Sequence, residues 1–427
     1  MRTLLKQTVA ALLAAISRAV VAKYRPTIVM VTGSVGKTST KDAIAAALSE
    51  RIYLRASEKG FNTEFGVPLT IIGVKNPWGS ALGWLGVMKE GLALIFLPNH
   101  YPKLLVLEVG ADKPGDLHKV LHIATPDVVV VTRLPEVPVH VEAYASPEAV
   151  REEEFVPAYG LAPGAPLIIS AEDEYAAAYA KRLSLTIHTF GTGKDADVRI
   201  ENADIMFEGG RPAGMQAEVT LDGVTGDLVV RGALGPHQML APAAAIATAN
   251  ALGIPFEHAL KGLASYFPPP GRMHILAGQK DTVLIDDSYN SSPIAAEEAL
   301  QALKSLPQVT RRIAVMGDML ELGRFSVEEH ERIGRVAAET CDVLITVGVR
   351  SRAMAEAART AGLANVHSFT TGPEAAELLH TLIQPGDAIL MKGSQNNIRL
   401  ERVVESLLAD PNDVSKLVRQ DKEWKVR

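Results

Sequence analysis

The chain has 427 residues, enough for two or three domains that each bury a core. Its formal net charge is −6, so composition gives no electrostatic case for binding nucleic acid. The single cysteine, Cys341, excludes a disulfide framework and a cysteine-rich zinc site, and it fits a reducing compartment.

Two apolar segments stand out in the first hundred residues. The stretch 4–21 is interrupted by polar residues, and its longest unbroken run, 9–16, is too short to cross a bilayer. We expect an amphipathic helix here, either packed on the domain or lying on a membrane surface. The segment 78–97 carries two tryptophans and is broken by one serine, one lysine and one glutamate. For both segments, packing within the protein is favoured over membrane contact.

A glycine-rich turn with the letters T-G-S-V-G-K-T-S-T occupies residues 32–40, between an apolar run and a helix-forming stretch. It is a shorter form of the phosphate-binding loop G-x-x-x-x-G-K-[ST]. The glycines let backbone amides point at phosphate oxygens, the lysine adds positive charge, and the threonine offers a hydroxyl to Mg²⁺. A glycine turn with a surface lysine is the simpler alternative, but the flanking strand and helix favour ATP binding. The predicted ATP-binding residues of this loop are Gly33, Ser34, Val35, Gly36, Lys37, Thr38 and Ser39.

Short β-rich runs alternate with helical patterns, which is typical of an α/β fold with a parallel sheet covered by helices. Strands are expected at 27–31, 104–108, 128–132, 167–170, 282–286, 312–316, 343–347 and 388–391. Helices are expected at 42–48, 174–182, 236–252, 294–306 and 327–338. The runs 215–221 and 226–230 flank an Asp222-Gly223 turn and predict an antiparallel hairpin.

Three prolines at 268–270 mark the clearest domain break, because they cannot continue a helix. We therefore expect a P-loop central domain and a smaller, Rossmann-like C-terminal domain. The predicted divisions are an N-terminal amphipathic helix over 1–24, a central domain over 25–271, a C-terminal domain over 272–410 and a charged surface tail over 411–427.

Other polar residues follow predicted strands, where open α/β sheets place their ligands. Glu108 ends a buried run and is a natural Mg²⁺ ligand, although a solvated loop carboxylate is the simpler interpretation. His140 follows the next strand through a proline-bearing loop, and a lone histidine is more often structural. The acidic run 152–154 is typical of a solvated helix face.

Taken in order, these motifs resemble those of the Mur ligase family, the ATP-dependent amide-bond formers of peptidoglycan synthesis. The resemblance spans about residues 27–408 and is strongest to the branch that adds D-alanyl-D-alanine. Besides the phosphate loop, the matching segments are N-T-E-F-G-V-P-L-T from residue 62, E-V-G-A from 108, H-V-E from 140, G-R at 271, D-D-S-Y-N from 286, G-D-M-L-E-L-G from 317 and K-G-S from 392.

The resemblance implies a role for each matching residue. Lys37 and the loop amides hold the ATP phosphates, Thr38 and Glu108 hold one Mg²⁺, and His140 holds a second. Arg272 and Asp287 act from the C-terminal domain on the phosphates and ribose. The implied catalytic residues are Lys37, His140, Glu154 and Arg272; further ATP contacts are Gln238, Tyr289 and Asn290; and the substrate residues are Asn62, Thr63, Glu64, Lys392 and Ser394.

The implied reaction is amide-bond formation through an acyl phosphate, with ATP and Mg²⁺ as cofactors and ADP as a product. The substrates are small molecules, a muramoyl-tripeptide-like carboxylate and a D-alanyl-D-alanine-like amine. The expected protein is a cytoplasmic monomer of cell-wall synthesis that binds no nucleic acid. Peripheral contact with the inner membrane surface stays open because of the two apolar segments.

The sequence departs from the family pattern in four places. About thirty residues precede the loop, too few for the family's UDP-binding domain. Glu154 stands where the family usually has a carbamylated lysine, and its carboxylate could replace the carbamate on the second Mg²⁺. The link 133–139 to His140 is longer than usual. Gln238 keeps the first amide of an adenine-contacting pair, and Ala241 loses the second.

Two alternatives follow from these departures. One is a ligase with the same chemistry that acts on a lipid-linked or other acceptor without UDP. The other is a non-catalytic ATP-binding paralogue that has lost a metal site. A GTPase is disfavoured because the sequence has no N-K-x-D guanine motif.

Overall fold

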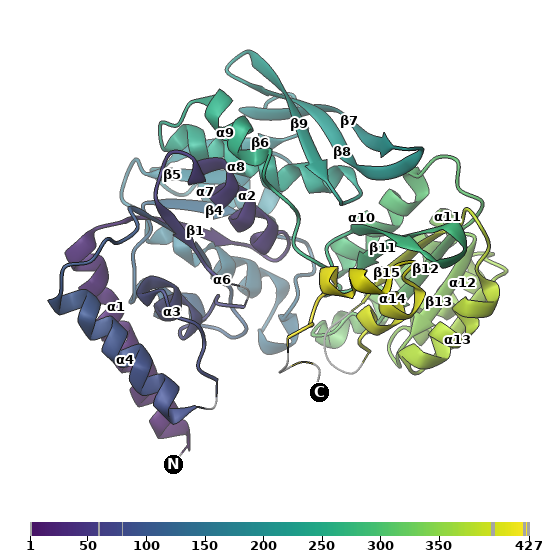
Figure 1. Ribbon diagram of the computed structural model, residues 1–427, viewed down its shortest axis with the longest axis horizontal. Coiled ribbons are helices and arrows are strands. Elements are labelled where there is room, and N and C mark those ends of the chain that lie inside the picture. Colours follow the sequence, from purple (N-terminus) through teal and green to yellow (C-terminus); the bar gives the residue numbers. More distant parts are fainter. Residues whose placement is uncertain (1, 59, 79, 394–397, 422–423, 425–427) are drawn as a thin grey trace. The chain divides into compact units, whose positions relative to one another are not determined.

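The computed structural model describes residues 2–58, 60–78, 80–393, 398–421 and 424, with the backbone alone at 2–6. Within these ranges the chain forms two compact units (Figure 1). Unit 1 contains residues 1–201, 218–228 and 240–266, and unit 2 contains 202–217, 229–239 and 267–427.

Unit 1 is built on parallel strands in the order β2-β3-β1-β4-β5-β6. They are β1 (Thr27–Thr32), β2 (Leu54–Ala56), β3 (Leu104–Glu108), β4 (Val128–Val131), β5 (Pro166–Ser170) and β6 (Thr186–Gly191). The central strands are buried on both faces, which explains their continuous apolar runs. Val31 pairs with Glu108 and Thr32 pairs with Val131, so the carboxyl ends of β1, β3 and β4 meet at one edge.

Helices cover both faces of this sheet. They are α1 (Arg2–Tyr24), α2 (Lys37–Ser49), α3 (Gly66–Ile72), α4 (Ala81–Phe96), α5 (Asp116–Leu121), α6 (Pro147–Tyr159), α7 (Glu174–Ala180), α8 (Leu240–Ala251) and α9 (Phe256–Leu263). Helices α2, α8 and α9 pack together on one side. The opposite side packs α3, α6 and α7 into a core with alternate residues of the strands, such as Met30, Leu107 and Val131. The predicted parallel sheet covered by helices is confirmed.

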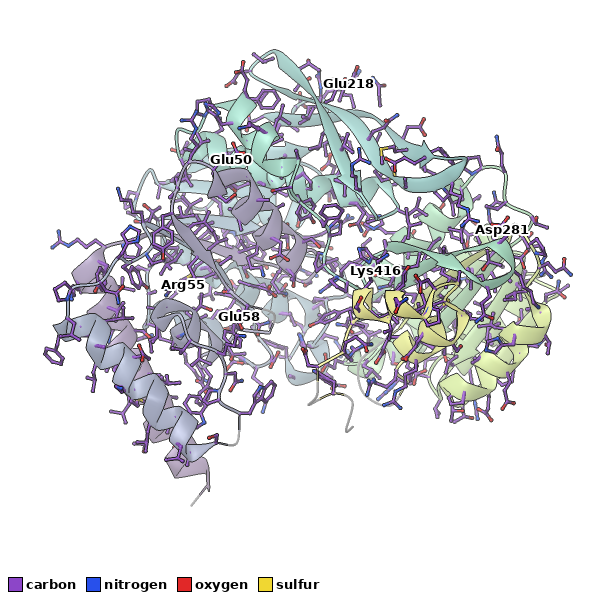
Figure 2. All side chains as sticks on the ribbon, viewed as in Figure 1. Glu50, Arg55, Glu58, Glu218, Asp281 and Lys416 are labelled. Atoms are coloured by element: carbon purple, nitrogen blue, oxygen red, sulfur yellow. The ribbon has the colours of Figure 1, made fainter. Side chains whose placement is uncertain are left out.

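The two apolar segments near the N-terminus are the helices α1 and α4, which lie side by side in Figure 1. Leu13 and Val20 of α1 are buried in the core that lies between α3 and the sheet. Nearby, the Arg55 side chain, labelled in Figure 2, donates to the carbonyls of Thr70 and Ile71 at the end of α3, at 3.1 and 2.8 Å. No helix in the described ranges is long and apolar enough to cross a membrane.

Beyond β6, the sheet continues through β7 (Val198–Glu208), β8 (Arg211–Leu221) and β9 (Val224–Arg231). The β8–β9 turn is the predicted Asp222-Gly223 pair, with φ of 50° and 78°. Positive φ at both central positions is the geometry that fits the twist of a two-residue hairpin. The predicted hairpin is therefore confirmed. Both strands extend beyond the predicted runs, because the apolar pattern does not include the residues at their ends.

Unit 2 has a second sheet in the order β10-β11-β15-β12-β13-β14, parallel except for β10 at the edge. Its strands are β10 (His274–Gly278), β11 (Thr282–Asp287), β12 (Arg312–Gly317), β13 (Val343–Val347), β14 (Val366–Phe369) and β15 (Ala388–Lys392). Its helices are α10 (Pro293–Ser305), α11 (Ser326–Thr340), α12 (Arg352–Thr360), α13 (Gly372–Leu382) and α14 (Glu401–Leu407), with short 3₁₀ turns at Pro236–Met239, Gln279–Asp281, Gly323–Phe325 and Pro411–Lys416.

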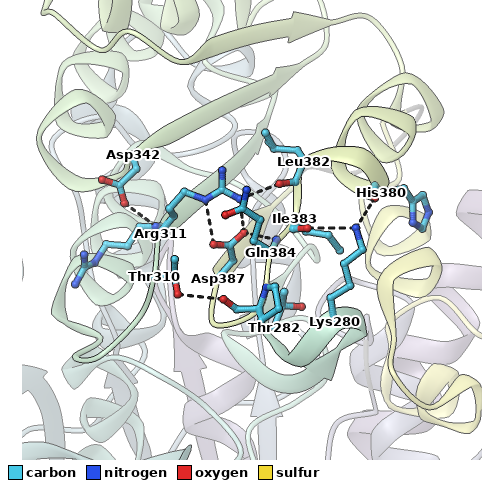
Figure 3. Close-up of polar contacts among 12 residues, drawn as sticks. Lys280, Thr282, Thr310, Arg311, Asp342, His380, Leu382, Ile383, Gln384 and Asp387 are labelled. Carbon is cyan, nitrogen blue, oxygen red and sulfur yellow. Dashed lines mark hydrogen bonds and ion pairs between the residues drawn. The ribbon is translucent and has the colours of Figure 1, made fainter.

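An ion pair joins the amino ends of two neighbouring strands of unit 2, β12 and β15 (Figure 3). Arg311 donates hydrogen bonds to both carboxylate oxygens of the fully buried Asp387, with Nε–Oδ1 at 3.1 Å and Nη2–Oδ2 at 2.7 Å. Arg311 directly precedes β12 and Asp387 directly precedes β15. The opposite, carboxyl edge is therefore left for ligand-facing groups, as is usual in such sheets.

The expectation of a charged surface tail after residue 410 is wrong for part of that segment. Leu417, Val418 and Arg419 are buried in unit 2. Two adjacent apolar residues carry no periodicity, so the pattern gave no signal that this segment packs.

Candidate active site

The phosphate loop joins β1 to α2 at the carboxyl edge of the unit 1 sheet. Gly33 has φ of +117°, and a Cβ there would lie 2.5 Å from Thr132 Oγ1. Gly36 has φ of +89° and caps α2. Both positions therefore require glycine, which confirms the predicted glycine turn between strand and helix. Helix α2 begins with no acidic residue in its first turn, so its N-terminal partial positive charge stays available to an anion.

Lys37 lies at the first turn of α2, and its ammonium donates to the Gly33 carbonyl, curling over the loop. Gly110 borders the same space: a Cβ built there would lie 3.5 Å from Lys37 Cε and 3.3 Å from Asn62 Nδ2. The Gly110 amide also donates to the Asn62 carbonyl at 3.1 Å. The side chains of Asn62 and Lys37 thus both border Gly110.

Thr38 and Glu108 meet beside the loop. The Thr38 hydroxyl donates to Glu108 Oε1 at 3.2 Å. Glu108 is buried, and its Oε2 has no hydrogen-bond partner among the residues that the structure describes. A buried carboxylate oxygen without a donor is costly, and a bound cation would satisfy it. A carboxylate next to a hydroxyl is a donor set that Mg²⁺ accepts, since this ion keeps several water ligands.

Glu154 lies behind the loop, on α6. Its carboxylate accepts a 2.5 Å hydrogen bond from Ser34 Oγ, and its carbonyl accepts from Thr32 Oγ1 at 2.6 Å. The side chain is 1% exposed. Burial raises the pKa of Glu154, while Lys37, the Ser34 hydrogen bond and His140 oppose that rise.

The solvated helix face expected for residues 152–154 is wrong at two of its three positions, because α6 turns Glu153 and Glu154 inward and leaves Glu152 exposed. Glu153 accepts from the amides of Gly115 and Leu117, both at 2.9 Å, and so caps α5. One carboxylate of the run thus serves a helix terminus, and the next one serves the phosphate loop.

His140 is held in a left-handed conformation, with φ of 65°, and its Nε2 lies 3.8 Å from Asp112 Oδ1. The described part of the chain contains no group of three or more His, Cys, Asp or Glu side chains placed to hold one metal ion. Of the four predicted metal ligands, Thr38 and Glu108 contact each other. Glu154 instead contacts Ser34, and His140 lies near Asp112. Their metal roles stay a prediction.

Two residues that the sequence patterns did not single out hold the long link at 133–139. Asp173 Oδ2 accepts from the Leu134 amide at 2.6 Å, and Asp173 also caps α7. Arg151 donates to the carbonyls of Pro135 and Glu136 at 3.2 and 2.7 Å. Both come from segments distant in sequence, so no local pattern could identify them.

The other predicted substrate residues of unit 1 lie at the start of α3. The Thr63 carbonyl accepts from Val67, and Glu64 Oε2 lies 3.5 Å from Lys119 Nζ. Ser394 lies outside the described residues.

In unit 2, the predicted ATP-contacting residues other than Gln238 lie at the carboxyl edge of the sheet. Asp287 and Lys392 are register partners, joined by a 2.9 Å ion pair, and Lys392 also donates to the Asn290 carbonyl at 2.6 Å. The Arg272 guanidinium lies over the Tyr289 ring, 4.3 Å from its centroid. Gln238, in the 3₁₀ turn before α8, is buried.

Arg419 is a further residue of this cluster that the sequence patterns missed. Its guanidinium donates to the carbonyls of Ser288 and Tyr289 at 3.3 and 2.6 Å. It is also ion-paired with the buried Glu401 at 3.2 Å. The segment that follows residue 410 thus fixes the backbone of the D-D-S-Y-N loop.

A glycine loop between a strand and a helix, with an acid beside its threonine, defines unit 1 as a P-loop nucleotide-binding fold. Residues 31–223 match the model of the Mur ligase middle domain, and residues 271–395 match that of the Mur ligase glutamate ligase domain. The chain belongs to the Mur ligase family.

Two similar curated relatives carry the same name. The chain is 28% identical over 387 residues to "UDP-N-acetylmuramoyl-tripeptide--D-alanyl-D-alanine ligase" of Bacillus subtilis, covering 90% of this chain and 76% of that protein. The protein of that name from Synechocystis is 29% identical over 90% of this chain and 75% of its own length. The chain thus spans about three quarters of these relatives.

Solved structures share the fold. MurF from Acinetobacter baumannii superimposes with a TM-score of 0.77 at 24% identity, covering 93% of this chain and 80% of that one. MurF ligase from Thermotoga maritima, solved in complex with ADP, gives a TM-score of 0.76 at 24% identity, covering 95% and 84%.

Proposed function

We propose that this protein is an ATP-dependent ligase that joins D-alanyl-D-alanine to the terminal carboxylate of a muramoyl-tripeptide. The names of the relatives support this reaction. The observation that carries it is the buried Glu108 carboxylate, with one unpartnered oxygen, beside the Thr38 hydroxyl at the phosphate loop. We further propose the domain divisions 25–271 and 272–410, with the first binding the ATP phosphates.

The loop residues would act on the phosphates directly. The amides of the loop and the N-terminus of α2 bind phosphate oxygens, and Lys37 supplies a positive charge next to them. Thr38 and Glu108 would hold a Mg²⁺ ion, which neutralises phosphate charge when bound. Ser34 is fixed by Glu154, so the loop keeps its shape when the nucleotide leaves.

The chemistry runs in two displacements. A carboxylate oxygen of the tripeptide attacks the γ-phosphorus, the bond to the β-phosphate oxygen breaks, and ADP leaves. The amine of D-alanyl-D-alanine then attacks the acyl carbon, inorganic phosphate departs with its electron pair, and the amine loses a proton. Charge neutralisation is the main need of the first step, because an anion attacks a polyanion. Lys37 supplies positive charge for that step, and Asn62, which also borders Gly110, can donate a hydrogen bond to a phosphate oxygen.

The unit 2 residues would bind the nucleotide from a preformed loop. Asp287, Tyr289 and Asn290 lie on one short segment whose carbonyls are held by Lys392 and Arg419. Arg272 presents its guanidinium over Tyr289, where it can reach an anionic phosphate. Gln238 is proposed as the adenine contact.

We propose that Glu154 replaces the carbamylated lysine of the family. Its carboxyl group carries the same terminal O–C–O arrangement and needs no CO₂ to form it. The contact with Ser34 and the influence of Lys37 support a place beside the phosphates. His140 would complete that second metal site together with neighbouring waters.

The test is an ADP-release assay with Mg²⁺-ATP, D-alanyl-D-alanine and muramoyl-tripeptides with and without a UDP group. We expect ADP and the amide product to form in equal amounts, and only when both substrates are present. ADP release at the same rate with and without D-alanyl-D-alanine would overturn the proposal. Turnover of the UDP-free peptide alone would assign a different acceptor to the same chemistry.

We also propose that the protein works as a monomer in the ATP-containing cytoplasm and makes peripheral contact with the inner membrane surface. The apolar helices α1 and α4 support that contact. Elution from a sizing column at twice the monomer mass would contradict the monomer.

A further inference from the structure

Helix α4 turns an apolar face to solvent. Leu82, Leu85 and Phe96 are 81%, 65% and 76% exposed, and Leu92 is 46% exposed. With the exposed Lys89, these residues recur at alternating spacings of three and four, which places them on one stripe of the helix. We call these five residues the α4 face. An apolar stripe facing solvent marks a binding surface, since solitary exposed leucines are common but aligned ones are not.

Tryptophan and leucine extend this surface beyond both ends of the helix. Trp78 precedes α4 and is 58% exposed, and Leu97 follows it and is 59% exposed. The Trp78 carbonyl accepts a 3.0 Å hydrogen bond from Trp84 Nε1, which ties Trp78 to the first turn of α4. The apolar surface therefore runs over the whole length of α4, about 24 Å at 1.5 Å per residue.

The other side of α4 is fixed against α1. A Cβ at Gly91 would lie 2.5 Å from Ile16 Cγ2, so only glycine allows the two helices to come this close. Lys23 of α1 donates to the carbonyls of Leu94 and Leu97, both at 2.7 Å, and so caps the end of α4. The α4 face is thus the side that this packing leaves outward, and it cannot rotate inward.

The helix pair α1 and α4 is opposite in charge to the whole protein. Residues 7–25 and 73–103, which cover most of α1, all of α4 and their flanks, contain six basic residues and one acidic residue, Glu90. The full chain carries a net charge of −6. An apolar stripe with surrounding positive charge complements an anionic lipid surface.

We propose that the α4 face docks the protein on an anionic lipid bilayer, with α4 lying flat in the headgroup region. A helix of 16 residues cannot span the hydrocarbon core, but its apolar stripe can enter the interface while Lys89 meets lipid phosphates. A second copy is the poorer partner, because it would bring the same basic segments against each other. Docking rests on the proposed membrane contact and names its surface and lipid class, whereas the ligase reaction can fail or hold without it.

The experiment measures co-sedimentation of the full chain with phosphatidylglycerol vesicles and with phosphatidylcholine vesicles. We expect binding to the anionic vesicles that weakens as salt rises, and at least tenfold weaker binding to the neutral ones. The double variant Leu85→Gln/Phe96→Gln should lose at least tenfold in binding. The matched control is Val327→Gln/Val349→Gln, which changes two exposed apolar residues of unit 2 and should bind normally.

Trp78 offers a second readout at the same surface. Its fluorescence should shift to shorter wavelength on anionic vesicles, and Trp78→Phe should remove most of that shift. ADP release in vesicle-free buffer should be unchanged in the α4 double variant, which shows that it folds. Equal vesicle binding by wild type and this variant would overturn the proposal. So would a wild-type dimer that the variant breaks without any vesicle binding, which would make the face a self-interface.

Discussion

The two units each present a ligand-facing edge, and the edges differ in where their positive charge comes from. In unit 1, Glu108 leaves one buried oxygen without a donor in the described residues. In unit 2, the corresponding strand-end acid, Asp287, is paired with Lys392, and the loop after it is held by Arg419. A bound cation would satisfy the free oxygen at the first edge, whereas the acid at the second edge is already paired with a cation of the chain itself. Substitutions at the first edge should therefore affect catalysis most, and those at the second should affect nucleotide affinity and stability.

The largest effect is expected for Lys37→Met. It removes the fixed charge at the phosphate loop and should lower ligase turnover by about 10³-fold, in the range seen when one electrostatic group is removed. ADP formation measures it. Lys261→Met is the control, because Lys261 is an exposed lysine paired with Glu50. An activity within twofold of wild type would show that this edge does not bind the reacting phosphates.

Glu154→Gln should reduce turnover by roughly tenfold to a hundredfold and raise the Mg²⁺ concentration needed. Glutamine keeps the volume and can still accept from Ser34, but it loses the charge. Glu152→Gln, on the exposed side of the same helix, is the matched control. Glu154→Lys should regain part of the activity when bicarbonate is added. Unchanged turnover and Mg²⁺ dependence in Glu154→Gln would rule out the carboxylate as a substitute for the carbamate.

Arg419→Met should raise KM for ATP by about tenfold with a smaller change in kcat, since the D-D-S-Y-N loop loses its support. Glu401, 1% exposed, would lose one of its two arginine partners, and the free energy of unfolding should fall by about 2–4 kcal/mol. Arg402→Met, at an exposed neighbour, should change neither quantity. If stability falls while KM for ATP stays constant, the segment is structural only.

The smallest effect concerns Asp286, and it depends on pH. Burial raises the pKa of Asp286 from 3.8 to about 6, opposed by hydrogen bonds from Ser288. Between these values the folded state binds more protons than the unfolded state, so stability falls as pH rises through this window and is level above it. Asp286→Asn stays neutral and should be more stable than wild type by roughly 1–3 kcal/mol at pH 7.5, with little difference at pH 4.

Urea unfolding at the two pH values measures this difference. Asp227→Asn, at an exposed aspartate, is the control and should give no pH-dependent gain. An Asp286→Asn protein that is less stable than wild type at pH 7.5 would show that the ionised carboxylate is needed in the fold.

Local patterns predicted the parts of the site that adjoin each other in sequence. The phosphate loop was recognisable because Gly33, Gly36 and Lys37 act within one turn, and Glu108 because it ends a buried strand. Asp173 and Arg419 were not predictable in this way, since each contacts backbone more than thirty residues away. The burial of Glu154 depends on which side of α6 meets β1 and β4, and an acidic run carries no signal for that choice.

The central claim is that the tripeptide carboxylate attacks the γ-phosphorus of ATP. It is tested most directly with tripeptide labelled with ¹⁸O in its terminal carboxylate, followed by mass analysis of the released phosphate. Our account predicts one ¹⁸O atom in each phosphate formed with D-alanyl-D-alanine, because the carboxylate oxygen leaves with phosphorus. Unlabelled phosphate, accompanied by normal amide product, would contradict activation through an acyl phosphate.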